Sequence, residues 1–427
     1  MNARSFRRGI GVVVIFLVLF ASMTFFRVRD YGDKSIDAQV AFKLLAVFVS
    51  IVVPVTAIIA RRMTITHPAH YMWLGCLLSF VVSSLYAPAF QVSVVGSIGL
   101  VGCFLFCIWM TGEYGEVRTA TFLILIVGFV ASVSLIVYFV HPELGRLHTW
   151  LGDKFGESNR IMGIAGSPNG LGLMTAVGLI MALLYFNRMS HRMRVIVLFA
   201  VVPTAICLVM TQNRMSYAAL LVCSMIFVGS RGNKAANFAL IGVYGTAVIA
   251  LVLLAPDKIL SLLSRSGDVG EITSGTGRSI IWSVVLELIA ARPLLGYGYG
   301  AATFILPLDP RLFYAAAHCH NLYLEVMFAG GFTSFLLFVA AVLMTLYEGI
   351  KGGRFEALLI FGFFLLRGIT ESSPFGGMPS FSAFAFFLSI SFIIAGVQQR
   401  AGAGAISKSA ADSIRRCRAR LHKPGTA

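Results

Sequence analysis

The sequence predicts an all-α protein that crosses a membrane many times. Of its 427 residues, 58% are hydrophobic and only 12% are charged, and the mean hydropathy is +0.86. Apolar runs recur along the chain, and about 20 apolar residues let a helix cross a hydrocarbon core roughly 30 Å thick. A closed β-barrel would instead show short segments of alternating hydrophobicity. A soluble domain of this size would show amphipathic patterns interrupted by turns.

The apolar runs predict about twelve membrane-spanning helices. The first run follows the basic stretch Arg-Ser-Phe-Arg-Arg and has no convincing small-residue cleavage site, so we expect it to be retained as a helix. The run 216–230 is the shortest. In chain order, the predicted spans are 9–26, 38–60, 69–86, 91–110, 119–140, 168–187, 195–212, 216–230, 235–255, 321–346, 356–371 and 380–397.

The placement of Lys and Arg predicts that both termini are cytoplasmic. With a cytoplasmic N-terminus, most of the basic residues fall in the inner segments, as the positive-inside rule requires. The net charge of +16 then belongs largely next to anionic lipid headgroups, and nucleic acid is not expected as a partner. The predicted regions are a bundle of about nine helices over 1–255, an outer loop over 256–320, further helices over 321–397 and a basic tail over 398–427.

The loop 256–320 is the longest segment expected outside the membrane, and loops of such length usually carry function. Within it, 278–291 (RSIIWSVVLELIAA) predicts an amphipathic helix that is too short and too closely flanked by charge to span a bilayer. The helix pattern breaks at Arg292-Pro293 and is followed by closely spaced glycines. The seven cysteines lie mostly inside apolar runs, so we expect them to be core residues.

The stretch AAHCHNLYLE at 316–325 gathers titratable side chains at the mouth of a predicted span. His318, Cys319 and His320 offer three metal donors in a row, although this spacing does not match a closed zinc site. Asn321 or a neighbour is suited to cap the following helix. A neutral imidazole is also suited to act as a general base, because its unperturbed pKa of about 6.5 lies near the working pH. The residues alone leave these alternatives open.

Three arginines belong to outer segments: Arg160 in SNRIM, Arg214 in TQNRMSY and Arg278 in TGRSIIW. A guanidinium is always charged and presents a fork of donors suited to diphosphate oxygens. For each arginine alone, snorkelling or binding of a lipid phosphate is the favoured explanation. Together with a histidine on the same side, they favour a site that handles phosphate.

Arg367 lies inside a predicted span, in LLRGITES, with Glu371 one turn later. Charges within spans are costly and tend to be paired or functional. We expect a structural pair between Arg367 and Glu371 at i,i+4, ahead of a direct contact with substrate. Glu325, in the second turn of the span that follows His320, is an alternative partner. Lys43 lies near the outer end of its helix, where it can snorkel.

These motifs resemble the O-antigen ligase and Wzy-type polysaccharide polymerase superfamily of bacterial envelope polysaccharide assembly. The most specific part is 276–330, with Arg-x-x-x-Trp in TGRSIIW, the stretch PLLGYG, and His-Asn-x-x-Leu opening a helix. Supporting matches are RIMGIAGSPNGLG at 160–172, NRMSYAAL at 213–220 and RGITE at 367–371.

The resemblance implies a GT-C-like, metal-independent glycosyltransferase that needs no cofactor. It implies transfer of a glycan from undecaprenyl diphosphate to an acceptor hydroxyl, with inversion, on the periplasmic face of the inner membrane. His320 would activate the acceptor, while Arg214 and Arg278 would hold the diphosphate. Diphosphate is already a good leaving group, so no metal is required if arginines neutralise its developing charge. The residues expected to bind substrate are Arg160, Asn321, Arg367 and Glu325.

Within this superfamily, RGITE and the chain length favour a polymerase of exopolysaccharide or O-antigen repeat units. The alternative is an O-antigen ligase, whose acceptor is lipid A-core. The expected partners are the lipid-linked donor, an acceptor glycolipid, membrane lipids, a flippase and a chain-length regulator. A transporter of lipid-linked glycan is a further alternative, but it would need polar or broken helices near the midplane in related halves.

Overall fold

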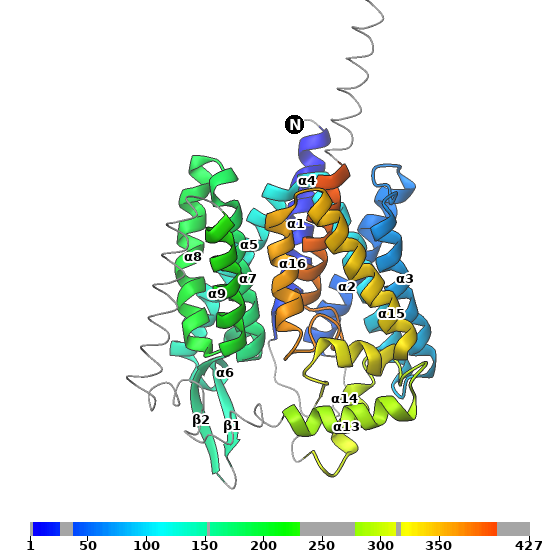
Figure 1. Ribbon diagram of the computed structural model, residues 1–427. Coiled ribbons are helices and arrows are strands. Elements are labelled where there is room, and N and C mark those ends of the chain that lie inside the picture. Colours follow the sequence, from blue (N-terminus) through cyan, green and yellow to red (C-terminus); the bar gives the residue numbers. More distant parts are fainter. Residues whose placement is uncertain (1–2, 26–36, 152–153, 231–277, 313–316, 399–427) are drawn as a thin grey trace, which may run out of the picture.

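The computed structural model describes residues 3–25, 37–151, 154–230, 278–312 and 317–398. Most of its helices run along a common direction, and a short hairpin and helix α13 (Arg278–Ala291) both lie at the same end of the bundle (Figure 1). Eight of the described helices are long and apolar enough to cross a membrane. The predicted all-α, polytopic membrane fold is confirmed. The total number of spans stays a prediction, because 235–255 lies outside the described residues.

The described helices follow the predicted spans closely. The eight spanning candidates are α2 (Ala38–Ile59), α3 with its 3-10 extension (Pro68–Tyr86), α4 (Phe90–Tyr114), α5 (Glu116–Val140), α7 with its extension (Pro168–Arg188), α8 (His191–Thr211), α15 (Leu322–Lys351) and the C-terminal helix (Phe381–Gln398). The remaining long helices are α1 (Ala3–Met23), α9 (Arg214–Ser230) and α16 (Phe355–Arg367). The basic tail and the first part of the long loop lie outside the described residues, so the proposed division into regions stays a prediction.

The C-terminal helix is the most buried of the eight candidates. Its phenylalanines pack around Trp73 of α3, whose ring lies 5.4 Å from that of Phe386 between centroids. The Trp73 indole N–H donates to Thr345 Oγ1 at 2.8 Å, so its polar atom is satisfied within the core. Exposed apolar side chains such as Phe48 and Ile59 on α2 are those expected to face lipid.

A two-stranded antiparallel hairpin follows α5 and the short helix α6 (Pro142–Gly145). Its strands are β1 (Arg146–Leu151) and β2 (Lys154–Ile161), and both project from the same end of the bundle as α13 (Figure 1). The sequence predicted an outer segment here but no strands. Arg160, the second-last residue of β2, is buried at 6% exposure.

The glycine-rich segment after α13 packs against a kink in α15. Gly330 and Gly331 have non-helical backbone angles, which divide α15 into two parts. The Tyr297 N–H donates to the Phe328 carbonyl at 2.8 Å, so the segment provides a hydrogen-bond donor for a carbonyl next to the kink. A Cβ on Gly331, whose φ is +63°, would lie 2.3 Å from the carbonyl carbon of Leu294. Glycine is therefore required there both for the left-handed backbone and for the close approach.

Candidate functional site

The loop before α15 is held by the turn that follows α16. The Leu322 N–H donates to the Gly368 carbonyl at 2.7 Å, and Asn321 Nδ2 donates to the Ile369 carbonyl at 2.9 Å. Asn321 Oδ1 accepts from the N–H groups of Tyr323 and Leu324, so Asn321 caps α15. Helix capping was one of the roles that the sequence predicted for this residue. A direct contact of Asn321 with substrate stays a prediction.

His320 has a left-handed backbone, with φ at +49°. This conformation is uncommon outside glycine and is retained only where the surrounding structure fixes it. Glu325, at 2% exposure, fixes the preceding residue by accepting the Cys319 N–H at 2.9 Å. Cys319 is fully buried among apolar residues of α13, whereas the rings of His318 and His320 lie together, 4.0 Å apart between centroids.

Glu371 lies at the centre of the site. Its Oε1 pairs with Arg278 Nη2 at 3.0 Å, and its Oε2 lies 3.9 Å from His320 Nδ1. The carboxylate is only 8% exposed. The first residue of α13 and the loop histidine therefore meet at one carboxylate, although 93 residues separate Arg278 from Glu371 along the chain.

The expected ion pair between Arg367 and Glu371 does not form; Glu371 pairs with Arg278 instead. Arg367 is buried at 3% exposure; it donates from Nη1 to Ser373 Oγ at 2.8 Å and from Nη2 to the Asn169 carbonyl at 3.3 Å. The i,i+4 pair was expected from helical spacing, but α16 ends at Arg367. Residues 368–371 are therefore free to turn the carboxylate toward α13.

Asn169, near the start of α7, links the remaining polar groups. Arg160 Nη2 donates to Asn169 Oδ1 at 3.3 Å, and Asn169 Nδ2 reaches Glu371 Oε1 at 3.5 Å. Asn213 Nδ2 donates to the Asn169 carbonyl at 3.1 Å. Arg214, the first residue of α9, directly follows Asn213. The structure thus connects Arg160 with the central carboxylate through one amide.

The site keeps His320 neutral over most of the physiological pH range. Burial, together with the neighbouring His318 and Arg278, lowers the pKa of His320 from 6.5 to about 4, and Glu371 opposes this shift. The His320 Nδ1 is buried and has no hydrogen-bond partner among the described residues. A neutral imidazole beside a carboxylate can accept a proton, and the carboxylate then stabilises the resulting cation.

The same atoms form a possible cation site. One ligand atom each from His318, His320 and Glu371 lie within 4.8 Å of one another. The alternative of three successive ligands is not realised, because Cys319 is buried against α13 instead. Arg278 already occupies one oxygen of Glu371, and its positive charge competes with a metal for that carboxylate. The residues therefore fit an anionic group better than a cation, and metal independence stays a prediction.

A cavity of about 520 Å³ adjoins the cluster. His318, Arg367 and Glu371 line its polar part, whereas apolar residues of α1, α7 and the C-terminal helix line the rest. Lys43 of α2 also lines it, with its ammonium 3.1 Å from the centre of the Phe25 ring. Arg278 and His320 do not line this cavity, but both contact or approach Glu371, which does line it.

Residues 199–339 match the model of the O-antigen ligase family. The resemblance found in the motifs is confirmed. An O-antigen ligase from Pseudomonas aeruginosa is 31% identical over 162 residues, which make up 36% of this chain. The chain spans 39% of the length of that relative. The part that matches the O-antigen ligase model contains Arg214, Arg278 and His320, whereas Arg160 and Glu371 lie outside it.

Several functional candidates were missed in the sequence. Asn169 lies within the matching stretch 160–172, but its side chain was given no role; the neighbouring Ser167 caps α7 by accepting the Gly170 N–H at 2.9 Å. Glu371 was considered only as a partner within its own helix. Lys43 was assigned to snorkelling, although the structure places it in the cavity. A polar side chain at the end of an otherwise apolar helix was the only available signal for any of them.

Proposed function

We propose that the protein transfers a glycan from undecaprenyl diphosphate to a hydroxyl of an acceptor glycolipid. The match to the O-antigen ligase family supports glycan transfer by a membrane protein. The observation that carries the proposal is the meeting of a neutral imidazole, a buried carboxylate and an arginine at Glu371. Proton acceptance and anion binding are the two capacities that such a transfer needs.

In the proposed reaction, the acceptor oxygen attacks the anomeric carbon as the bond from that carbon to the diphosphate oxygen breaks. The bonding electrons leave with the diphosphate, and the acceptor proton passes to His320. The imidazolium formed is stabilised by Glu371, whose Oε2 lies 3.9 Å away. Direct displacement inverts the anomeric centre. The proton then returns to solvent, or to the diphosphate that has left.

The arginines are proposed to bind the diphosphate. Arg278 uses one N–H for Glu371, and a guanidinium has five N–H donors, so others are available for phosphate oxygens. Arg214, Arg160 and Arg367 add positive charge nearby. The adjoining cavity has a polar part for the diphosphate and apolar walls suited to the first isoprene units.

Two acceptors distinguish the candidate functions. The short RGITE element and the chain length favour a polymerase, which adds the glycan to another lipid-linked oligosaccharide. The relative from Pseudomonas aeruginosa is an O-antigen ligase, which favours lipid A-core as acceptor. A flippase that supplies the donor is an expected partner of either a polymerase or a ligase. A chain-length regulator is an expected partner of a polymerase only.

The experiment uses purified protein in liposomes with a lipid-linked repeat unit, with and without lipid A-core. Lengthened lipid-linked product in the absence of lipid A-core identifies a polymerase. Product that forms only with lipid A-core identifies a ligase. Movement of the donor between leaflets without any new glycosidic bond would support a transporter and refute the proposal. His320→Ala protein is the control for background hydrolysis.

The proposed placement is the inner membrane, with both termini in the cytoplasm and the site on the periplasmic face. Reporter fusions after residue 192 and at the C-terminus should report cytoplasm, whereas fusions near residues 155 and 270 should report periplasm. A cytoplasmic signal near 270 would contradict the proposed orientation of the site.

A further inference from the structure

A separate cavity of about 520 Å³ lies among the ends of helices distant from the candidate site. It is formed by the start of α1, the end of α2 with the residues that follow it, the end of α4 and the end of the C-terminal helix. The start of α1 lies at the end of the bundle opposite α13 (Figure 1). Its volume is within the range of pockets that hold small molecules or headgroups, roughly 300–1,000 Å³.

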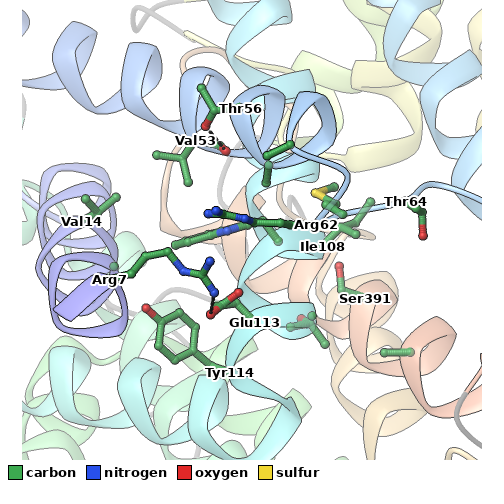
Figure 2. A pocket seen from close by; sticks show the side chains of 18 of the residues that line it. Arg7, Val14, Val53, Thr56, Arg62, Thr64, Ile108, Glu113, Tyr114 and Ser391 are labelled. Atoms are coloured by element: carbon green, nitrogen blue, oxygen red, sulfur yellow. Dashed lines mark hydrogen bonds and ion pairs between the residues drawn. The ribbon is translucent and has the colours of Figure 1, made fainter. Parts of the chain in front are cut away.

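The charged residues leave this cavity with an excess of positive charge. Arg7 Nη2 pairs with Glu113 Oε1 at 3.1 Å, and Arg8 Nε lies 3.7 Å from the same oxygen. Arg62 has no acidic partner in the part of the chain that the structure describes. Figure 2 shows the side chains of Arg7 and Arg62 reaching into the cavity from opposite sides. A group with negative charge would therefore be attracted between them.

His70 provides an independent indication of a ligand. This residue of α3 lines the cavity and is only 3% exposed. Its Nδ1 is buried and forms no hydrogen bond to any described residue. His67, which itself faces Glu348, and Phe104 pack against the ring, with centroids about 6 Å away. A buried polar nitrogen without a partner is rare in folded proteins, and a bound polar molecule is one way to satisfy it.

The rest of the cavity wall is partly apolar, although Thr56, Thr64 and Ser391 also line it. Val14, Val53 and Ile108 come from three different helices, and Figure 2 shows them around the arginines. Gly11 lets α1 approach α4 closely, because a Cβ there would lie 2.0 Å from the Tyr114 hydroxyl oxygen. An inorganic ion would need only the polar half of such a space. A molecule with a charged head and an apolar body would fill both halves.

We propose that this cavity binds the phosphate-bearing headgroup of an anionic membrane lipid, in the leaflet opposite the candidate transfer site. Arg62 and Arg7 contact the phosphate, His70 hydrogen-bonds to a neighbouring oxygen of the headgroup, and the acyl chains follow the apolar wall. The shared chemistry is that of a phosphate ester, which free inorganic phosphate partly imitates. This site is distinct from the transfer reaction, and neither depends on the other.

The test is native mass spectrometry of the delipidated full-length protein, with phosphatidylglycerol, phosphatidylcholine or inorganic phosphate added separately. We expect one phosphatidylglycerol to be retained, phosphatidylcholine to be lost, and inorganic phosphate not to displace the lipid. Arg62→Gln should lower retention at least fivefold. Arg61→Gln is the matched control, because it removes the same charge from the adjacent residue, which does not line the cavity.

A second measurement guards against misfolded variants. Thermal unfolding of wild type in detergent should shift to higher temperature with phosphatidylglycerol, and this shift should be lost in Arg62→Gln and reduced in His70→Phe. Equal retention in Arg62→Gln and wild type would overturn the proposal, as would equal retention of both lipids. Binding of inorganic phosphate alone, with no lipid retained, would overturn the lipid assignment.

Discussion

Replacing Glu371 with Gln tests the central carboxylate with little change in shape. The Glu371 Oε2 lies 3.9 Å from His320 Nδ1. At an effective dielectric constant of about 20, two unit charges at that distance interact by about 4 kcal/mol. This value is an upper limit for the stabilisation of a protonated His320, because Arg278 offsets part of the carboxylate charge. We expect roughly half of it to be lost, or roughly a thirtyfold fall in turnover.

The pH profile gives the same substitution a second readout. Glu371 raises the pKa of His320 against burial and the neighbouring cations. Its neutralisation should therefore lower the pKa of His320 below its value of about 4, and the acidic limb of the turnover profile should move to lower pH. A purely structural role would lower turnover without moving this limb.

The assay is turnover of lipid-linked donor by purified protein in liposomes from about pH 3 to about pH 8, so that it includes the acidic limb near the His320 pKa of about 4. Glu356→Gln is the matched control, since Glu356 pairs with Arg188 at the other end of α16. Full turnover by Glu371→Gln, with an unchanged acidic limb, would refute the role assigned to this carboxylate.

The other substitutions and treatments separate the remaining roles. His320→Ala should abolish transfer but leave donor binding almost intact, whereas His318→Ala should be tolerated; the reverse result would show that the wrong histidine was chosen. Arg278→Ala should lower turnover roughly a hundredfold, about 3 kcal/mol, and Arg278→Lys should restore it only partly. Because Arg278 lowers the pKa of His320, Arg278→Ala should also move the acidic limb to higher pH. Turnover near wild type in Arg278→Ala would argue against diphosphate binding by this residue. Excess EDTA should leave transfer unchanged, and a loss restored by zinc or magnesium would instead support a metal bound by the two histidines and Glu371.

The spans were predictable because each depends on a local property, a run of apolar residues of sufficient length. The helix at 278–291 was predictable from another local property, its amphipathic pattern, and the structure places it at Arg278–Ala291. The hairpin over 146–161 was not predicted, because its short and largely polar strands give a weak alternating signal.

The composition of the site was only partly predictable. His320 and Arg278 belong to motifs, so their types and positions indicated a function. The pairing of Arg278 with Glu371 depends on tertiary structure, and helical spacing favoured Arg367 as the nearer partner. Asn169 was hidden for a similar reason, because its contacts with Arg160 and Glu371 join distant parts of the chain.

The position of Glu371 also bears on how the protein is made. Ribosomes synthesise a chain from its N-terminus, so Arg160, Arg278 and His320 all enter the membrane before this carboxylate does. The loop that carries His320 is held by carbonyls at 368 and 369, which arrive equally late. A nascent or prematurely ended chain therefore has the arginines but neither the anchored histidine nor its carboxylate partner. The candidate site is therefore complete only when the last part of the protein has been inserted.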